Sequence, residues 1–270
     1  MFWKRVISAI IFASIVIAII HKGGSWGFLA LVTVAVILSS IEFLGFVPSK
    51  KNGLLNIIII PINCLLCFSP LKNEIIDINL LLCIAVILPF IYVITKREPK
   101  YSLITVSASA LCILYIGLMF GYHIVLIRQM PNGRELIYLL LGVTWSGDIG
   151  AYLIGKWFGK HKIIPSISPK KSLEGYIAGL IFGIGTSIAI CYFLRLEISI
   201  NHAIILGFLL TIIGQLGDLA ESILKRNAGI KDSGKLMPGH GGILDRCDSL
   251  IFITPTLYYY AIYILKLAGD

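Results

Sequence analysis

The sequence is poor in charge. Asp, Glu, Lys and Arg make up only 14% of its 270 residues, whereas 57% of the residues are hydrophobic and the mean hydropathy is +0.91. A water-soluble globular domain carries about 25% charged residues, so this composition excludes that class and indicates a polytopic membrane protein. The sequence also lacks internal repeats, low-complexity tracts and any polar stretch long enough to form a soluble domain.

Acidic residues are scarcer than basic ones. The 14 Asp and Glu stand against 23 Lys and Arg, which gives a formal net charge of +9. In a soluble protein this balance would suggest a nucleic-acid partner. In a membrane protein, however, Lys and Arg concentrate in cytoplasmic loops, next to anionic lipid headgroups. We therefore expect these basic residues to contact the headgroups of the lipid bilayer, and we expect no nucleic-acid partner.

Cysteine patterns that would indicate disulfides or zinc are missing as well. Cys83, Cys112 and Cys191 each stand alone in an apolar run. Cys64 and Cys67 have redox or zinc spacing, but no second pair of ligands follows them. We expect these cysteines to pack as small hydrophobic side chains.

Long apolar runs make up most of the sequence. A membrane crossing needs about 20 apolar residues, and candidate runs lie at about 6–20, 24–44, 54–68, 78–95, 102–120, 136–155, 173–194, 202–224 and 249–265. No small-residue cleavage site follows the first run, so it is interpreted as a retained span rather than a signal peptide. The sequence thus predicts an all-α, polytopic integral membrane protein with about nine transmembrane helices. Whether 54–68 and 78–95 cross fully stays open.

The distribution of basic residues predicts the orientation of these spans. If the N-terminus is cytoplasmic, 17 of the 23 Lys and Arg fall in cytoplasmic segments. The positive-inside rule then predicts an outside C-terminus and places the polar loops 156–172 and 225–248 in the cytoplasm. We expect the protein in the cytoplasmic (inner) membrane, with residues 1–135 as transmembrane scaffold and residues 136–270 as the catalytic transmembrane region.

The charge that the sequence does contain is concentrated in residues 217–249. Four polar residues of this segment share one face of a helix: Asp218, Glu221, Ser222 and Lys225. Asp245 and Asp248 are three residues apart and can point at one ion. Glycines between the two groups let backbone N–H groups turn towards an anion. Carboxylates for a hard divalent cation, surrounded by Lys and Arg, predict a phosphate-handling site.

Two acidic residues lie within earlier spans. Asp148 falls in the cytoplasmic half of the span 136–155, where an isolated carboxylate is costly, so we expect a cavity, a cation or a basic partner to meet it. A structural ion pair with a neighbouring helix is the alternative. Glu42 lies near the end of the span 24–44, and we expect an interfacial role for it.

The segment 165–175, P-S-I-S-P-K-K-S-L-E-G, forms a second cytoplasmic element. Lys170, Lys171 and Ser172 stand where a span begins, and a helix N-terminus favours phosphate. Glu174 is expected to cap that terminus.

Residues 222–248 follow the pattern S-I-L-K-R-x4-K-D-S-G-K-x-x-P-G-H-G-G-x-x-D-R-x-D. This pattern resembles the signature of the phosphatidate cytidylyltransferases, the CDP-diacylglycerol synthases. Met237 and Cys247 stand where other apolar residues are expected. The segment 165–175 is similar to a second run of the same family. The resemblance implies an enzyme, a nucleotidyltransferase, that converts CTP and phosphatidate to CDP-diacylglycerol and pyrophosphate for phospholipid synthesis.

Roles for individual residues follow from this chemistry. Two anions must meet, so we expect Mg²⁺ as cofactor; whether a second, monovalent cation joins it stays open, as does a homodimer. We expect the catalytic residues to be Asp218, Asp245, Asp248 and Lys225. The expected metal ligands are Asp218, Asp245, Asp248 and Asp148. The expected substrate contacts are Lys170, Lys171, Ser172, Ser222, Arg226, Lys231, Asp232, His240, Gly241, Gly242 and Arg246.

Other functions are compatible with parts of the pattern. A CTP-dependent polyprenol or dolichol kinase would use similar substrates but transfer the γ-phosphoryl group. An ion-coupled transporter would also carry intramembrane Asp residues, but near the bilayer midplane rather than at one rim. A CDP-alcohol phosphotransferase is disfavoured because its D-G-x2-A-R-x8-G-x3-D-x3-D motif is absent.

Overall fold

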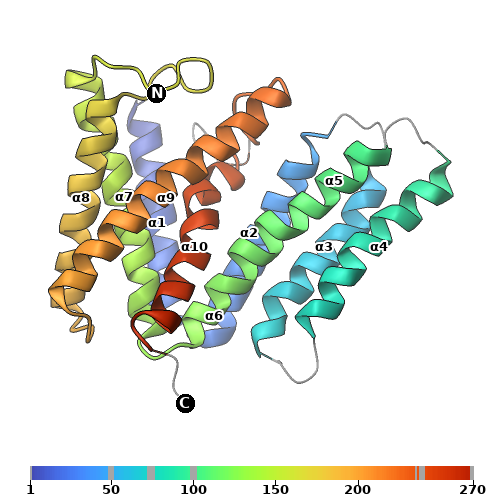
Figure 1. Cartoon of the computed structure of the whole chain (residues 1–270), viewed down its shortest axis with the longest axis horizontal. Helices are drawn as coiled ribbons and strands as arrows, with labels where there is room; N and C mark the ends of the chain where they lie inside the picture. Colours follow the sequence, from blue (N-terminus) through green and yellow to red (C-terminus); the bar gives the residue numbers. More distant parts are fainter. Residues whose placement is uncertain are drawn as a thin grey trace. The chain divides into compact units, whose positions relative to one another are not determined.

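The computed structural model of the chain describes residues 2–47, 52–71, 77–97, 102–234, 236 and 241–267, with the backbone alone for residues 2–9 and 52–54. Within these residues the protein is helical and contains no strand (Figure 1). An isolated antiparallel bridge joins Lys162 and Ser172. The expected all-α class is therefore confirmed.

The helices coincide with the apolar runs of the sequence. In chain order they are α1 (Phe2–Lys22), α2 (Gly24–Leu44), α3 (Asn52–Phe68), the 3₁₀ turn η1 (Ser69–Leu71), α4 (Ile78–Lys96), α5 (Ser102–Cys112), the π-helical η3 (Ile113–Tyr122), α6 (His123–Gln129), α7 (Gly133–Phe158), α8 (Leu173–Phe193), α9 (Ile200–Asn227) and α10 (Leu244–Tyr263). Each of the nine expected spans corresponds to one helix or to the continuous stretch α5–η3–α6.

Fewer helices than expected meet the requirements for crossing a membrane. Among the described residues, six are long and apolar enough: α2, α4, the stretch from α5 to α6, α7, α8 and α9. The described apolar parts of α1 and α3 are shorter. Helix α10 begins with Asp245, Arg246 and Asp248, whose charges lower its mean hydropathy. The structure thus supports a polytopic membrane protein with about six candidate spans.

The contacts divide the chain into two compact units. Unit 1 contains Met1–Leu126 and Asn227–Cys247, and unit 2 contains Ile127–Arg226 and Asp248–Asp270. The described residues of the segment 227–247 therefore pack with the N-terminal helices. The reason is a set of hydrogen bonds to α2, described below.

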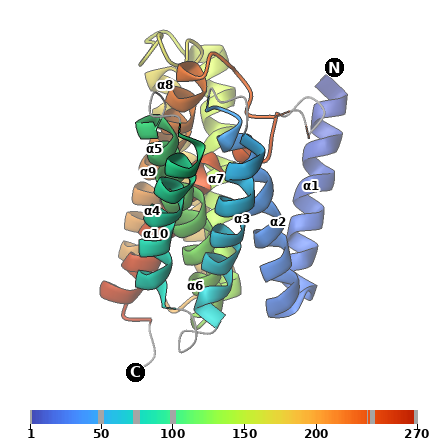
Figure 2. The same cartoon turned by 90° about the vertical axis from the view of Figure 1, so that its right-hand side faces the viewer.

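Unit 1 is built on contacts of α2 with α1 and α3, of α3 with η3, and of α4 with α5 (Figure 2). A buried polar contact joins three helices at its centre, because Asn63 Nδ2 lies 2.8 Å from Ser40 Oγ and 3.8 Å from Cys112 Sγ. Cys67 and Cys112 are buried free thiols. Cys67 thus packs as the small side chain that was expected, whereas Cys112 also takes part in the polar contact with Asn63.

Unit 2 depends on glycines that bring helix backbones together, as is common in membranes. A Cβ atom at Gly175 would lie 2.8 Å from Ala151 O, and one at Gly179 would lie 2.9 Å from Gly147 O. Helices α7 and α8 therefore pack backbone against backbone. Between α8 and α9, a Cβ atom at Gly207 would lie 2.6 Å from Ile184 Cα.

This packing makes Gly207→Ala an informative change. The added methyl group would force α8 and α9 apart, and we expect a loss of about 1–3 kcal/mol of stability. Gly185→Ala in α8 is the matched control, because a Cβ atom there meets no heavy atom within 4 Å. Thermal unfolding of the purified variants in detergent measures the stability of each. Equal melting temperatures for the two variants would contradict the close α8–α9 approach.

Candidate functional site

A cavity of about 640 Å³ lies in unit 2, between α7, α8, α9 and the 159–172 loop that joins α7 to α8. Its charged lining residues are Asp148, Lys156, Lys162, Lys170, Lys171 and Asp218. Four ammonium groups against two carboxylates give the cavity an excess of positive charge. Such a lining favours a ligand with several negative charges.

Helix α7 supplies one wall. Asp148, Tyr152 and Lys156 follow each other at intervals of four residues, so they share one helix face, and all three line the cavity. Of the cavity, cation or basic partner expected beside Asp148, the structure shows a cavity. At the end of the helix, a Cβ atom at Gly159 would lie 2.9 Å from Ser172 Cβ. The absence of a side chain there lets the loop fold back against α7.

The 159–172 loop is held by Glu174. Its carboxylate accepts hydrogen bonds from the backbone N–H groups of Lys160 (3.1 Å) and His161 (3.2 Å), and lies 2.6 Å from His161 Nδ1. The N-terminus of α8 is capped by Ser172 instead, whose Oγ accepts from Gly175 N at 3.2 Å. The expected cap by Glu174 was therefore wrong, because this side chain turns back to the loop.

Lys171 and Asp218 form an ion pair inside the cavity. The ammonium group of Lys171 also lies 5.9 Å from the centre of the Tyr176 ring. Gln215, one turn before Asp218 on α9, donates from Nε2 to Tyr176 O at 3.3 Å. These contacts fix α8, α9 and the loop relative to one another.

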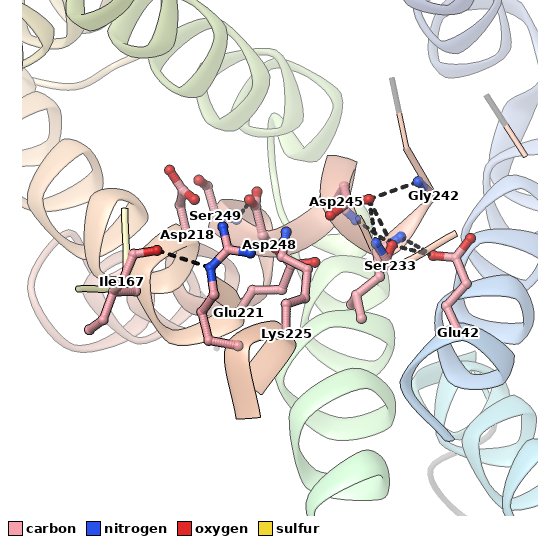
Figure 3. A network of polar contacts seen from close by, with 12 residues as sticks. Glu42, Ile167, Asp218, Glu221, Lys225, Ser233, Gly242, Asp245, Asp248 and Ser249 are labelled. Carbon is pink, nitrogen blue, oxygen red and sulfur yellow. Dashed lines mark hydrogen bonds and ion pairs between the residues drawn. The ribbon is translucent and has the colours of Figure 1, made fainter. Parts of the chain in front are cut away.

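Several carboxylates gather in unit 2. Asp148 on α7 and Asp218 on α9 line the cavity. Asp248 on α10 is close enough to be repelled by both of them and by Glu221 (Asp218, Glu221 and Asp248 are drawn in Figure 3). Ser249 N donates to Asp248 Oδ1 at 2.6 Å. Three of the four acids proposed from the sequence as metal ligands therefore lie in one neighbourhood.

Lys225 lies in a different environment from the one expected. It forms an ion pair with Glu221, one turn earlier on α9, and both side chains are buried. Arg226 is exposed, and its Nε donates to Ile167 O in the 159–172 loop at 3.2 Å (Figure 3).

Asp245 belongs to unit 1, where it has protein partners. Its Oδ2 accepts hydrogen bonds from Ser233 N at 2.9 Å and from Gly242 N at 2.8 Å, and it lies 2.9 Å from Ser233 Oγ. Gly241 has φ +79°, a conformation that favours glycine. The glycines do turn an N–H group towards an anion, but here the anion is a carboxylate of the protein.

Other expected substrate contacts are more exposed to solvent than Lys225. Ser222 is half-buried, whereas Lys231, Asp232 and Arg246 are exposed. His240 lies outside the described residues.

Sequence reasoning missed several cavity residues. Lys156, Lys162, Tyr152 and Gln215 line the cavity but were not among the expected contacts. A signal for two of them was present, since Tyr152 and Lys156 lie four and eight residues after Asp148. No such signal marks Lys162 or Gln215, because their positions depend on how the loop and α9 fold.

Carboxylate oxygens are ligands suited to Mg²⁺, and the repulsion around Asp248 is of the kind that a cation relieves. Within the described part of the chain, no three His, Cys, Asp or Glu side chains already form a ligand set. The donor chemistry thus fits Mg²⁺, while Asp218 would have to exchange its ion pair with Lys171 for the metal.

Comparison with known proteins connects this site to a family. The chain is 38% identical over 182 residues to a phosphatidate cytidylyltransferase of Staphylococcus haemolyticus (strain JCSC1435), covering 67% of this chain and 68% of that protein. It is 38% identical over 175 residues to one of Bacillus subtilis (strain 168), covering 65% of each. It is 40% identical over 158 residues to one of Staphylococcus saprophyticus, covering 58% of this chain and 60% of that protein.

The matched regions thus span between 60% and 68% of these three relatives. The family match is longer, since it runs over residues 3–264 and includes both units. A match over this length shows that the chain belongs to the Cytidylyltransferase family.

Proposed function

We propose that the protein transfers the cytidylyl group of CTP to phosphatidate and so forms CDP-diacylglycerol and pyrophosphate for phospholipid synthesis. The family match over residues 3–264, with relatives named phosphatidate cytidylyltransferase, is the observation that carries this proposal. A phosphate oxygen of the lipid forms a bond to the α-phosphorus of CTP. The bond from that phosphorus to the bridging oxygen breaks, and pyrophosphate leaves with the electron pair.

The charge of the unit 2 cavity supports this reaction. Both substrates are anions, so their repulsion must be offset before they can approach. Lys156, Lys162 and Lys170 would bind phosphate oxygens, and Lys171 would be oriented by Asp218. No nucleophilic side chain is needed, because the lipid phosphate itself attacks.

Asp148, Asp218 and Asp248 would hold the Mg²⁺ in unit 2. Asp245, in unit 1, is held by hydrogen bonds from Ser233 N and Gly242 N. When bound, Mg²⁺ would neutralise developing charge on the transferred and leaving phosphates.

The lipid substrate would approach along α7. Tyr152 lines the cavity and is 61% exposed, and the neighbouring Ile149 and Leu153 are exposed apolar side chains. This face would accommodate acyl chains while Lys156 meets the phosphate at the polar end.

The orientation in the membrane belongs to the same proposal. With the N-terminus in the cytoplasm, the lysine-rich 159–172 loop is cytoplasmic, where CTP is found, and most basic residues obey the positive-inside rule. The site would then face the cytoplasm from the inner membrane. Nine crossings would put the C-terminus outside.

The test follows two labels into the lipid. Purified protein is incubated with Mg²⁺, phosphatidate and CTP labelled with ³²P at either the α- or the γ-position. We expect only the α-label in the lipid, and no product after chelation of the metal. Transfer of the γ-label, with polyprenol or dolichol as acceptor, would indicate a lipid kinase instead. Solute flux in vesicles without CTP turnover would indicate a transporter.

A further inference from the structure

A carboxylate from the N-terminal region lies among the glycines of residues 233–245. Glu42, in the last turn of α2, accepts hydrogen bonds from Ile243 N at 3.0 Å and from Leu244 N and Ser233 Oγ at 2.8 Å each (Figure 3). All of these residues belong to unit 1. The contacts join segments about 190 to 200 positions apart in the chain, so they are tertiary rather than local.

The glycines around this carboxylate leave the space that it occupies. A Cβ atom at Gly234 would lie 2.9 Å from Glu42 Cδ, and one at Gly242 would collide with both Glu42 Oε2 and Ser233 Oγ. On this backbone, glycine at these two positions is therefore needed for the close approach of Glu42.

Ser233 links Glu42 to Asp245. Its Oγ lies 2.8 Å from Glu42 Oε2 and 2.9 Å from Asp245 Oδ2. Asp245 is in the first turn of α10, and Asp248 follows it by three residues in the same helix. Whatever fixes residues 243–245 therefore fixes where this helix starts, and with it the direction of the acidic side chains that follow.

We propose that Glu42 is a positioning residue for cytidylyl transfer. It touches neither substrate: it holds the first turn of α10 and, through Ser233, the carboxylate of Asp245. The expected change in kcat rests on the proposed function. The expected protection of the Ile243 and Leu244 amides from hydrogen exchange does not depend on it.

The geometry distinguishes Glu42 from a substrate-binding group. The N–H groups of Ile243 and Leu244 are those that could bind a phosphate at the start of α10, and Glu42 already accepts from both. Its side chain is negative, so it would repel CTP and phosphatidate rather than bind them. A change at Glu42 should consequently alter kcat more than the KM for CTP.

Glu42→Gln is the main test. The amide keeps the size of the side chain. In the wild type both carboxylate oxygens accept from backbone N–H groups, whereas in the variant the NH₂ group, a donor, must face one of these N–H donors. A displacement of about 1 Å at a catalytic group can cost about 100-fold in rate, so we expect kcat to fall by about 10- to 100-fold. The KM for CTP should change by less than about threefold. The charge-retaining Glu42→Asp should keep more activity than Glu42→Gln.

Two further variants examine the link through Ser233. Ser233→Ala should lower kcat by itself, and Glu42→Gln/Ser233→Ala should be less damaging than the product of the two single effects, since both act on one network. Glu197→Gln is the control, because Glu197 is an exposed glutamate in unit 2. It should leave kcat unchanged.

Hydrogen exchange followed by mass spectrometry supplies a readout that does not need CTP. In Glu42→Gln, peptides that contain residues 243 and 244 should exchange faster, while peptides from α7 and α8 exchange as in the wild type. Wild-type kcat in Glu42→Gln, a raised KM with unchanged kcat, or faster exchange throughout the protein would each overturn the proposal. An inactive wild-type protein with this local exchange pattern would refute the proposed function instead.

Discussion

Asp218→Asn is expected to lower the turnover of CTP and phosphatidate by about 10³-fold, which corresponds to about 4 kcal/mol of transition-state stabilisation. Asp218 lines the cavity, pairs with Lys171 and lies near Asp248. Asparagine keeps the shape of the side chain but removes the charge that orients Lys171 and that a cation requires. The measurements are kcat, both KM values and the Mg²⁺ concentration that gives half-maximal rate, which should rise.

Two further variants make this result specific. Asp77→Asn is the matched control, because Asp77 caps α4 in unit 1 by accepting from Asn79 N, and Asn is an equally good cap. It should leave turnover unchanged. The double variant Asp218→Asn/Lys171→Met removes both members of the ion pair. Recovery of activity in the double variant would mean that Asp218 only neutralises Lys171, and would contradict a role in metal binding.

Lys225→Met is expected to lower the stability of the protein by about 3–5 kcal/mol, since it removes the cation from the buried ion pair with Glu221. A buried carboxylate that loses its charged partner is far more costly than a buried apolar side chain. Thermal unfolding in detergent, together with the yield of folded protein, measures the effect.

The double variant Glu221→Gln/Lys225→Met separates stability from catalysis. Replacing both charges of a buried pair is often close to neutral, so we expect the melting temperature to return towards that of the wild type. If Lys225 also contacts the triphosphate, activity should stay low in this folded double variant. Full recovery of activity would restrict Lys225 to its contact with Glu221. Unchanged stability in the single variant would contradict the buried pair itself.

The helices of this protein could be predicted from its sequence because the membrane imposes them. Apolar runs of sufficient length have few alternatives to a helix in a bilayer, where every backbone group must be paired. The same constraint does not determine which helices cross. Helix α10, with Asp245, Arg246 and Asp248 among its first five residues, does not meet the hydropathy requirement within the described residues.

Parts of the site were also predictable. The expected set of metal ligands put Asp148 and Asp218 together, and both line the same cavity. The pair of Glu221 and Lys225 could have been predicted from their spacing of four residues. The sequence placed both residues on one helix face, whereas the role expected for Lys225 was catalytic.

The contacts of Glu42 could not be predicted, because nothing local connects α2 to a segment about 190 residues later. Its position near a span end was consistent with any interfacial role. Only the folded chain shows that the glycines around it make room for this one side chain.

The glutamate of α2 also determines how far the chain can be shortened. A fragment that begins at α7 would keep every residue lining the cavity, yet it would lack the acceptor for the amides of Ile243 and Leu244 at the start of α10. A split protein, cut in the short turn between α6 and α7 and expressed as two pieces, would supply that acceptor from the other piece. Complementation between the halves, rather than activity of the C-terminal half alone, is the behaviour that this arrangement dictates.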